Sequence, residues 1–218
     1  MKTVAFVPIK LNNERFPGKN LKEFSDGTPL INVLLNKLVH LKEKTIDEIY
    51  VYCSDEQIIK YLPEEVRFLK RPVFLDEKQT KGRRIYEEFV KEIKADIYVL
   101  AHVTTPFVSE EHILQCIDMV KGGEYDSSFC AKKLQTFFWK DGRPFNFELD
   151  NPPRTQDMEP FYIEIPTPYV FTYDSFQRNH ARTGEHPYIC ECSEIESVDI
   201  DYPDDFELAD SIYRRLSK

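Results

Sequence analysis

Short, continuous runs of hydrophobic residues recur along the chain, and stretches with helical spacing of apolar residues separate several of them. Runs of this length are typical of strands that are buried on both faces of a sheet. Strands are predicted at residues 3–8, 48–53, 66–69, 96–102 and 168–172. Helices are predicted from Thr28 and Pro29 onward, over 81–94, after Ser109, and over 204–216 with Leu216 facing inward. This alternation predicts an α/β sandwich with a mainly parallel sheet.

The pattern changes between residues 130 and 165, where helical periodicity ends and aromatic and proline residues crowd together. Asp141-Gly142 is a strong signal for a two-residue hairpin turn. We therefore expect a single domain over residues 1–218 with an inserted β-rich arm at about 130–165. The aromatic residues of this arm form either a small second core or a surface for a partner, and the sequence leaves both alternatives open.

The chain is acidic, with 29 Lys and Arg residues against 38 Asp and Glu residues among its 218 residues and a net charge of −9. Such a field repels polyanions, so neither a nucleic acid nor a membrane surface is an expected partner. The first apolar run is far shorter than the ~20 residues of a membrane span, and it is also too short for a signal peptide. A soluble protein of the cytoplasm is expected.

The cysteines are odd in number and widely scattered, at positions 53, 116, 130, 190 and 192, and they include no Cys-x-x-Cys pair. A zinc site would need a second tight pair or clustered histidines. Cys190 and Cys192 have no such partner nearby in the sequence, so we interpret them as alternating positions of a strand. This usage of cysteine also fits a reducing compartment.

A basic loop follows the first predicted strand. Its cationic and asparagine side chains are Lys10, Asn12, Asn13, Arg15, Lys19 and Asn20. Ligands of open α/β sheets bind beyond the carboxyl ends of the strands, so these side chains are placed to neutralise a polyphosphate. The chain has only 7 glycines, and the loop lacks the glycine pattern of a Walker A or dinucleotide motif. A solvated basic loop without a ligand is the alternative.

An acidic pair stands near the end of the chain, where Val198-Asp199-Ile200-Asp201 alternates apolar and acidic residues. In a strand, this alternation aims both carboxylates at the same face. Two adjacent carboxylates repel each other unless a cation lies between them, and Mg²⁺ prefers such oxygen ligands. A surface strand beside further acidic residues is the alternative. Together with the basic loop, the pair supplies the parts needed for nucleotidyl or phosphoryl transfer.

At these positions the sequence resembles the cytidylyltransferases that activate acidic sugars. These are the CMP-sialic acid synthetases (acylneuraminate cytidylyltransferases) and the related CMP-Kdo synthetases. The resemblance rests on motifs in family order: Pro8-Ile9-Lys10, Pro17-Gly18-Lys19-Asn20-Leu21, Cys53-Ser54-Asp55, Arg71-Pro72, Leu100 to Pro106, Pro153-Arg154-Thr155-Gln156, and Asp199-Ile200-Asp201. The first and last motifs are fairly specific when they occur together.

The resemblance implies a Rossmann-like nucleotidyltransferase three-layer sandwich with a small β-rich dimerisation arm. It implies the reaction of CTP with an acidic sugar to give a CMP-sugar and pyrophosphate, with Mg²⁺, in a homodimer. Lys10, Lys19 and Asp201 are the implied catalytic residues, and Asp199 and Asp201 are the implied metal ligands. The nucleotide is expected to contact Lys10, Asn12, Asn13, Arg15, Lys19, Asn20, Arg71 and Thr104. The acceptor is expected to contact His102, Arg154 and Gln156.

The sequence departs from the family pattern at several of these positions. Lys10 replaces an arginine, which keeps the charge but loses a bidentate fork. Asn13 stands where the family often has serine, and His102 replaces a glutamine that contacts the sugar. Residues 164–168 lack the character of the sialic-acid enzymes, so the acceptor can be another acidic sugar or a phosphorylated polyol. A catalytically weak nucleotide-binding paralogue is a further alternative.

Overall fold

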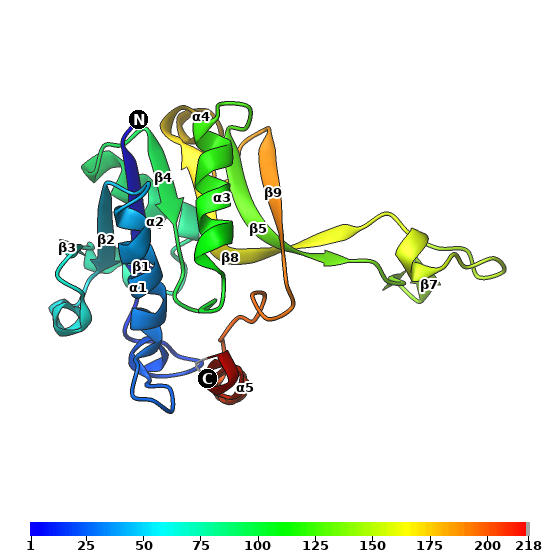
Figure 1. The fold of residues 1–218 in the computed structure, drawn as a ribbon, viewed down its shortest axis with the longest axis horizontal. Helices are drawn as coiled ribbons and strands as arrows, with labels where there is room; N and C mark the ends of the chain where they lie inside the picture. The colour runs from blue at the N-terminus through cyan, green and yellow to red at the C-terminus, as the bar shows by residue number, and fades with distance from the viewer. Residues whose placement is uncertain (217–218) are drawn as a thin grey trace.

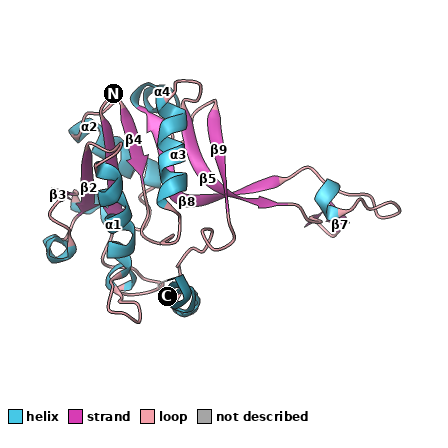
Figure 2. Ribbon diagram, in the orientation of Figure 1, coloured by secondary structure: helices cyan, strands magenta, loops and turns pink. Residues whose placement is uncertain are grey.

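The computed structural model describes residues 1–216, and its centre is a seven-stranded sheet in the order β3-β2-β1-β4-β8-β5-β9 (Figure 2). The strands are β1 (Thr3–Ile9), β2 (Glu48–Cys53), β3 (Val66–Lys70), β4 (Ile97–Leu100), β5 (Ser127–Leu134), β8 (Phe161–Thr172) and β9 (Pro187–Cys192). β8 runs antiparallel to both of its neighbours, and the other neighbouring pairs are parallel. The predicted, mainly parallel sheet is confirmed.

Helices cover both faces of this sheet. The helices are α1 (Leu30–Lys42), α2 (Gly82–Glu92), α3 (Glu110–Lys121), α4 (Tyr173–Asn179) and α5 (Pro203–Leu216), with 3-10 turns at Lys19–Leu21, Glu56–Tyr61, Val73–Asp76 and Thr155–Asp157. α1 and α3 pack against one face, as Figure 1 shows, and α2 and α4 pack against the other. The three-layer α/β sandwich is therefore confirmed. Among the described residues, no helix is both long and apolar enough to cross a membrane.

The first strand shows how the sequence produces two cores. Its side chains alternate between the faces, so Ala5 and Val7 join the core under α1 and α3 while Val4 and Phe6 join the core under α2. The Phe6 ring stacks on Phe89 of α2 with the ring centroids 4.1 Å apart. Since both faces of the strand are buried, its sequence is a continuous apolar run.

Helix boundaries follow the predictions in part. Ser109 caps α3, because its side chain accepts a hydrogen bond from the His112 amide at 3.2 Å. Thr28 does not cap α1: it belongs to the preceding turn, where its amide donates to Asp26, and Pro29 takes the capping position without a side-chain bond. Leu216 was expected to face inward, but it lies in the last turn of α5 and is 58% exposed.

The arm is a continuation of two strands of the sheet. β5 and β8 stay paired from Ala131 opposite Glu164, where β9 still flanks β5, out to Leu134 opposite Phe161, and the arm projects far from the sheet (Figure 1). It carries a small hairpin of β6 (Trp139–Lys140) and β7 (Arg143–Pro144). The predicted turn is confirmed, since Asp141 and Gly142 both have positive φ, at 51° and 73°.

The aromatic residues of the arm are divided between two environments. Some pack together within the arm, such as Phe138 against Phe161 with centroids 5.1 Å apart. Trp139 and Phe145 are instead 58% and 57% exposed. The aromatic side chains of the arm thus contact one another, but none of them is buried, and the arm presents an apolar surface to solvent.

Candidate active site

A pocket of about 700 Å³ lies where three parallel strands end. Lys10 directly follows β1, Arg71 directly follows β3, and His102 comes two residues after β4, and all three line the pocket. Further parts of the wall come from the rest of the loop after β1, from the segment that leads into α2, and from Asp201. This is the edge of the sheet at which open α/β proteins bind their ligands.

The basic loop after β1 forms one side of this pocket. Lys10 reaches across it, and its Nζ donates to the backbone oxygen of Asp76 at 2.5 Å. Asn20 lies buried beneath the loop, where its side-chain amide donates to the Lys10 carbonyl at 3.0 Å. Asn12, Asn13, Arg15 and Lys19 all line the pocket. Asn20 itself does not, so its contact with the loop is a positioning one.

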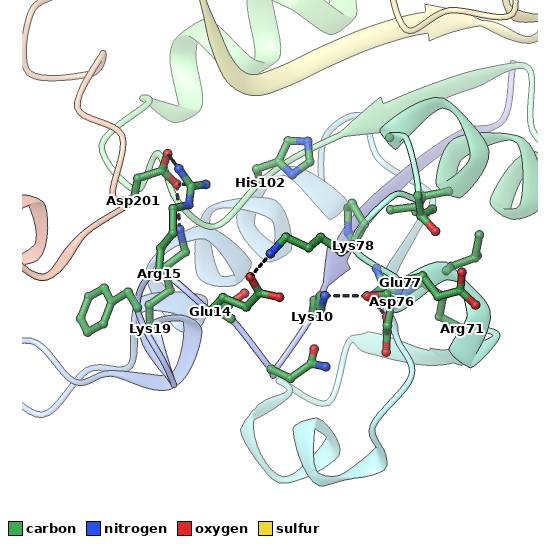
Figure 3. A pocket seen from close by; sticks show the side chains of 18 of the residues that line it. Lys10, Glu14, Arg15, Lys19, Arg71, Asp76, Glu77, Lys78, His102 and Asp201 are labelled. Atoms are coloured by element: carbon green, nitrogen blue, oxygen red, sulfur yellow. Dashed lines mark hydrogen bonds and ion pairs between the residues drawn. The ribbon is translucent and has the colours of Figure 1, made fainter.

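Asp201 meets the cations of this loop at one end of the pocket (Figure 3). The Arg15 guanidinium donates to both carboxylate oxygens, at 2.7 and 3.0 Å. Lys19, which is almost fully buried, donates to the Ile200 carbonyl at 2.6 Å and to Asp201 at 3.1 Å. The structure therefore brings together the basic loop and the acidic segment. The paired residues are 186 positions apart in the sequence for Arg15 and Asp201, and 182 for Lys19 and Asp201.

The acidic segment is not the strand that its alternation predicts. Residues 198–201 form an extended loop with no sheet partner, in which the Ile200 amide donates to the Thr104 carbonyl at 2.8 Å. The alternation instead places Ile200 in a hydrophobic cluster with Phe16 and Phe206. Asp201 lines the pocket and Asp199 does not. Neighbouring protein atoms desolvate the Asp199 carboxyl and raise its pKa, and the charge of Asp201 adds to this rise.

Arg71 lies at the opposite end of the pocket, with only 2% of its surface exposed (Figure 3). Its guanidinium pairs with the Asp76 carboxylate, which also accepts a hydrogen bond from Ser54. The Nε atom of Arg71 is buried without a hydrogen-bond partner among the described residues, and so is the side-chain nitrogen of Asn13. Buried polar atoms of folded proteins are nearly always satisfied, so these two donors in the pocket wall favour a ligand that carries acceptors.

The segment between β3 and α2 contributes residues that the sequence interpretation missed. Asp76, Glu77 and Lys78 line the pocket, as does Tyr86 of α2, and Lys78 forms an ion pair with Glu14 of the basic loop at 2.9 Å (Figure 3). A signal for them exists in the sequence, because they follow a predicted strand in the same way as the basic loop does. None of them was predicted as a site residue, although this rule applies to the end of the third strand as well.

His102 is held at the pocket by its backbone. Its amide donates to the Thr167 hydroxyl at 2.8 Å, and its carbonyl accepts from that hydroxyl at 2.7 Å. Burial, together with the positive charge of Arg182, lowers the pKa of His102 to about 4. The imidazole is therefore neutral near pH 7. A neutral ring can donate one hydrogen bond and accept another, as the glutamine that it replaces in the resembled family can.

A pH-dependent stability follows from the lowered pKa of His102. The unfolded histidine, with a pKa near 6.5, takes up a proton as the pH falls toward 4, and the folded one does not. His102 therefore supports the fold above pH 6.5, and this support is lost as the pH falls. Between pH 7.5 and 5, the free energy of unfolding should fall about 2 kcal/mol further in the wild type than in His102→Gln. Urea unfolding of both proteins at pH 7.5 and at pH 5 measures this difference. If the free energy of unfolding falls equally in the wild type and in His102→Gln, His102 does not have the lowered pKa.

Other predicted site residues lie outside the pocket. Thr104 is in the loop after β4, where its carbonyl binds Ile200 instead of facing the cavity. Arg154 and Gln156, expected at the acceptor, are exposed on the arm, and Arg154 pairs with Asp157 at 2.9 Å. The ribbon of β5 and β8 carries both residues away from the pocket of their own chain (Figure 1), so their contact with an acceptor stays a prediction.

The fold and the pocket define a class of protein. A mainly parallel sheet between helices, with a basic pocket at the strand ends, is the architecture of a Rossmann-like nucleotidyltransferase. The chain matches the model of the cytidylyltransferase family over residues 4–210. It belongs to this family, and the resemblance inferred from the motifs is confirmed.

Individual relatives are distant. The chain is 22% identical over 216 residues to N-acylneuraminate cytidylyltransferase A of Danio rerio, in a match that covers 94% of this chain and 49% of the relative. It thus spans about half the length of that curated relative. The structure is similar to CMP:2-keto-3-deoxy-manno-octonic acid synthetase complexed with CTP, with a TM-score of 0.72, 13% identity and 99% of each chain covered.

A second solved structure has a similar fold. It is the 4-diphosphocytidyl-2C-methyl-D-erythritol synthase of Anaerococcus prevotii, with a TM-score of 0.69, 17% identity, and 98% of this chain and 96% of that chain covered. The names of these proteins point to different acceptors on one common fold. Family membership therefore defines the class of enzyme, and the acceptor has to be argued from the pocket.

Proposed function

We propose that this protein transfers CMP from CTP to an acidic sugar and releases pyrophosphate. The observation that carries the proposal is the cluster of cationic side chains in the pocket wall. Lys10, Arg15, Lys19, Arg71 and Lys78 gather there, beside the acidic side chains of Glu14, Asp76, Glu77 and Asp201 with which several of them pair. A nucleoside triphosphate carries the complementary negative charge, and side chains of this kind bind phosphate oxygens through charge-assisted hydrogen bonds.

Asp201 and Asp199 are the residues that we propose to hold Mg²⁺. The Asp201 carboxylate in the pocket wall fits the ion, because Mg²⁺ prefers carboxylate oxygens and is usually bound by one or two carboxylates together with substrate phosphates, and Asp199 lies two residues away, outside the wall. Arg15 and Lys19 neutralise Asp201 in the ligand-free pocket and would turn to the triphosphate when it binds. The bound ion would supply positive charge that stabilises the pyrophosphate leaving group.

The transfer itself requires positioning and charge, and no covalent nucleophile. The acceptor hydroxyl oxygen attacks the α-phosphorus in line, the bond from the α-phosphorus to the bridging oxygen breaks, and the hydroxyl proton leaves to a base or solvent. Lys10 and Lys19 stabilise the charge that develops on the phosphates. The unpartnered nitrogens of Asn13 and Arg71 are available to orient the nucleotide.

The acceptor is tested by measuring pyrophosphate release with each of the four nucleoside triphosphates across a panel of sugar acids and phosphorylated polyols. Release with CTP and a sugar acid is expected. Release only with a polyol phosphate would show that the protein is a cytidylyltransferase whose acceptor is not a sugar acid. Thermal stabilisation by CTP without turnover on any acceptor would support the catalytically weak paralogue instead.

We also propose that the arm joins two copies of the chain into a homodimer. The support is its exposed apolar surface, which includes Trp139 and Phe145 on a segment that projects from the body. The double variant Trp139→Ser/Phe145→Ser is expected to be monomeric by light scattering coupled to gel filtration, whereas the wild type has twice the monomer mass. Ile59→Ser, at a similarly exposed apolar residue of the body, is the control and should remain dimeric. A monomeric wild type would overturn this proposal.

We place the enzyme in the cytoplasm. Its five cysteines are all free and buried in the part of the chain that the structure describes, which supports a reducing compartment.

A further inference from the structure

Four of the five cysteines gather at one place in the core, beneath α3. Cys116 projects from α3, Cys130 lies on β5, and Cys190 and Cys192 lie on β9, which Figure 1 shows as neighbouring elements. The parallel register of β5 and β9 places Cys130 directly opposite Cys190. The strand positions of Cys190 and Cys192 are thus as predicted. Their missing partners come from other elements, which the spacing along the sequence cannot show.

The ligand atoms at this place form two close groups of three, and Cys192 belongs only to the second of them. The ligand atoms of Cys116, Cys130 and Cys190 all lie within 4.8 Å of one another, and those of Cys190, Cys192 and His112 do so as well. The two triads share Cys190. The sulfur atoms of Cys116 and Cys130 are 3.9 Å apart. In a tetrahedral zinc site with Zn–S bonds of about 2.3 Å, neighbouring sulfur atoms are separated by about 3.8 Å.

The surroundings of the cluster are those of a closed site. The side chains of Cys116, Cys130 and Cys190 are at most 1% exposed, and Cys192 is 7% exposed. None of the four lines the pocket, so catalysis has no use for them. The His112 Nδ1 atom faces the Cys192 sulfur at 3.4 Å but is already hydrogen-bonded to Glu196 at 2.7 Å. The thiolates are therefore better placed than His112 to act as ligands.

We propose that Cys116, Cys130 and Cys190 hold a structural zinc ion and that the Cys192 side chain turns toward them to supply the fourth thiolate. Soft thiolate ligands select zinc over the hard cations that carboxylates bind, and buried sites with four protein ligands are typically structural. The site would tie α3 to β5 and β9. Since β5 continues into the arm and β9 is the edge strand of the sheet, the ion would fix the base of the arm against the body. This proposal does not depend on the acceptor or on the nucleotide.

The test starts from the wild-type chain, expressed with added zinc and purified without chelators. About one zinc per chain is expected by elemental analysis. After removal of the metal, loading with Co²⁺ should produce the thiolate-to-cobalt charge-transfer absorption of a tetrahedral site. A wild-type chain that retains no zinc and gains no such absorption would overturn the proposal, and this result requires no variant to fold.

Variants then assign the ligands. Cys190→Ser should lose the zinc, because Cys190 belongs to both triads. Cys53→Ser is the matched control, since Cys53 is an equally buried cysteine outside the cluster, and it should keep the metal. Zinc retained in Cys190→Ser would refute the site. Zinc lost in His112→Ala but kept in Cys192→Ser would overturn the assignment of the fourth ligand.

Discussion

Asp201→Asn is expected to reduce the rate of CTP-dependent pyrophosphate release by roughly a hundredfold to a thousandfold. The substitution keeps the shape of the side chain and removes the charge that faces Arg15 and Lys19 in the pocket. It also removes a carboxylate from the pair that we propose to bind Mg²⁺. Steady-state kinetics at saturating CTP, over a range of magnesium concentrations, measures the loss and its dependence on the ion.

Asp204→Asn is the matched control for this variant. Asp204 is an exposed acidic residue of the same segment, in the first turn of α5, and it does not line the pocket. Its substitution changes the net charge equally and should leave the rate within about twofold of the wild type, as a surface change away from the site. Equal rates in the wild type and Asp201→Asn would show that the Asp201 carboxylate takes no part in the reaction.

Arg71→Met is expected to lower the free energy of unfolding by about 3–5 kcal/mol, as removal of one partner from a buried ion pair does. The change leaves the carboxylate of Asp76 without its ion-pair partner, and the Asp76 side chain is only 14% exposed. It should also weaken CTP binding by at least about tenfold, because it removes a guanidinium from the pocket wall. Urea unfolding and titration calorimetry with CTP measure the two effects.

Two further variants separate these effects. Arg67→Met removes an exposed arginine of β3 that pairs with Glu48, and it should cost less than about 1 kcal/mol. The double variant Arg71→Met/Asp76→Asn no longer leaves a buried charge unpaired, so it should recover most of the stability and still bind CTP weakly. Full CTP affinity in the double variant would show that Arg71 supports the fold and not the nucleotide.

The sequence predicts the layers of this fold well because burial leaves a direct trace in it. The strand at Thr3–Ile9 is apolar throughout because both of its faces are covered, and Ser109 marks the start of α3 because its hydroxyl caps the helix. Residues 198–201 show where this reasoning ends. Their alternation reports that Ile200 is buried, but a loop without a sheet partner alternates in the same way as a strand.

The site was predictable where it follows strand ends in order along the chain. Lys10 could be placed at the edge of the sheet because it follows the first predicted strand, whereas Arg71 and His102 were expected there only from the resemblance to the family. Contacts that arise from packing between elements far apart in the sequence could not be predicted in this way. The cysteine cluster under α3 and the ion pair of Glu14 with Lys78 depend on helix placement and loop course. The position of Arg154 and Gln156 on the arm, outside the pocket of their own chain, was also not predictable, because sequence motifs do not reveal the length and direction of the arm.

The transfer of label from [α-³²P]CTP to a sugar acid tests the central claim most directly. With wild-type protein, Mg²⁺ and the acceptor found in the panel, the label should move from CTP into a CMP-sugar, with one pyrophosphate released for each product formed. Label that remains in CTP, or that appears only as free CMP, with every sugar acid tested would contradict the proposed function of this pocket.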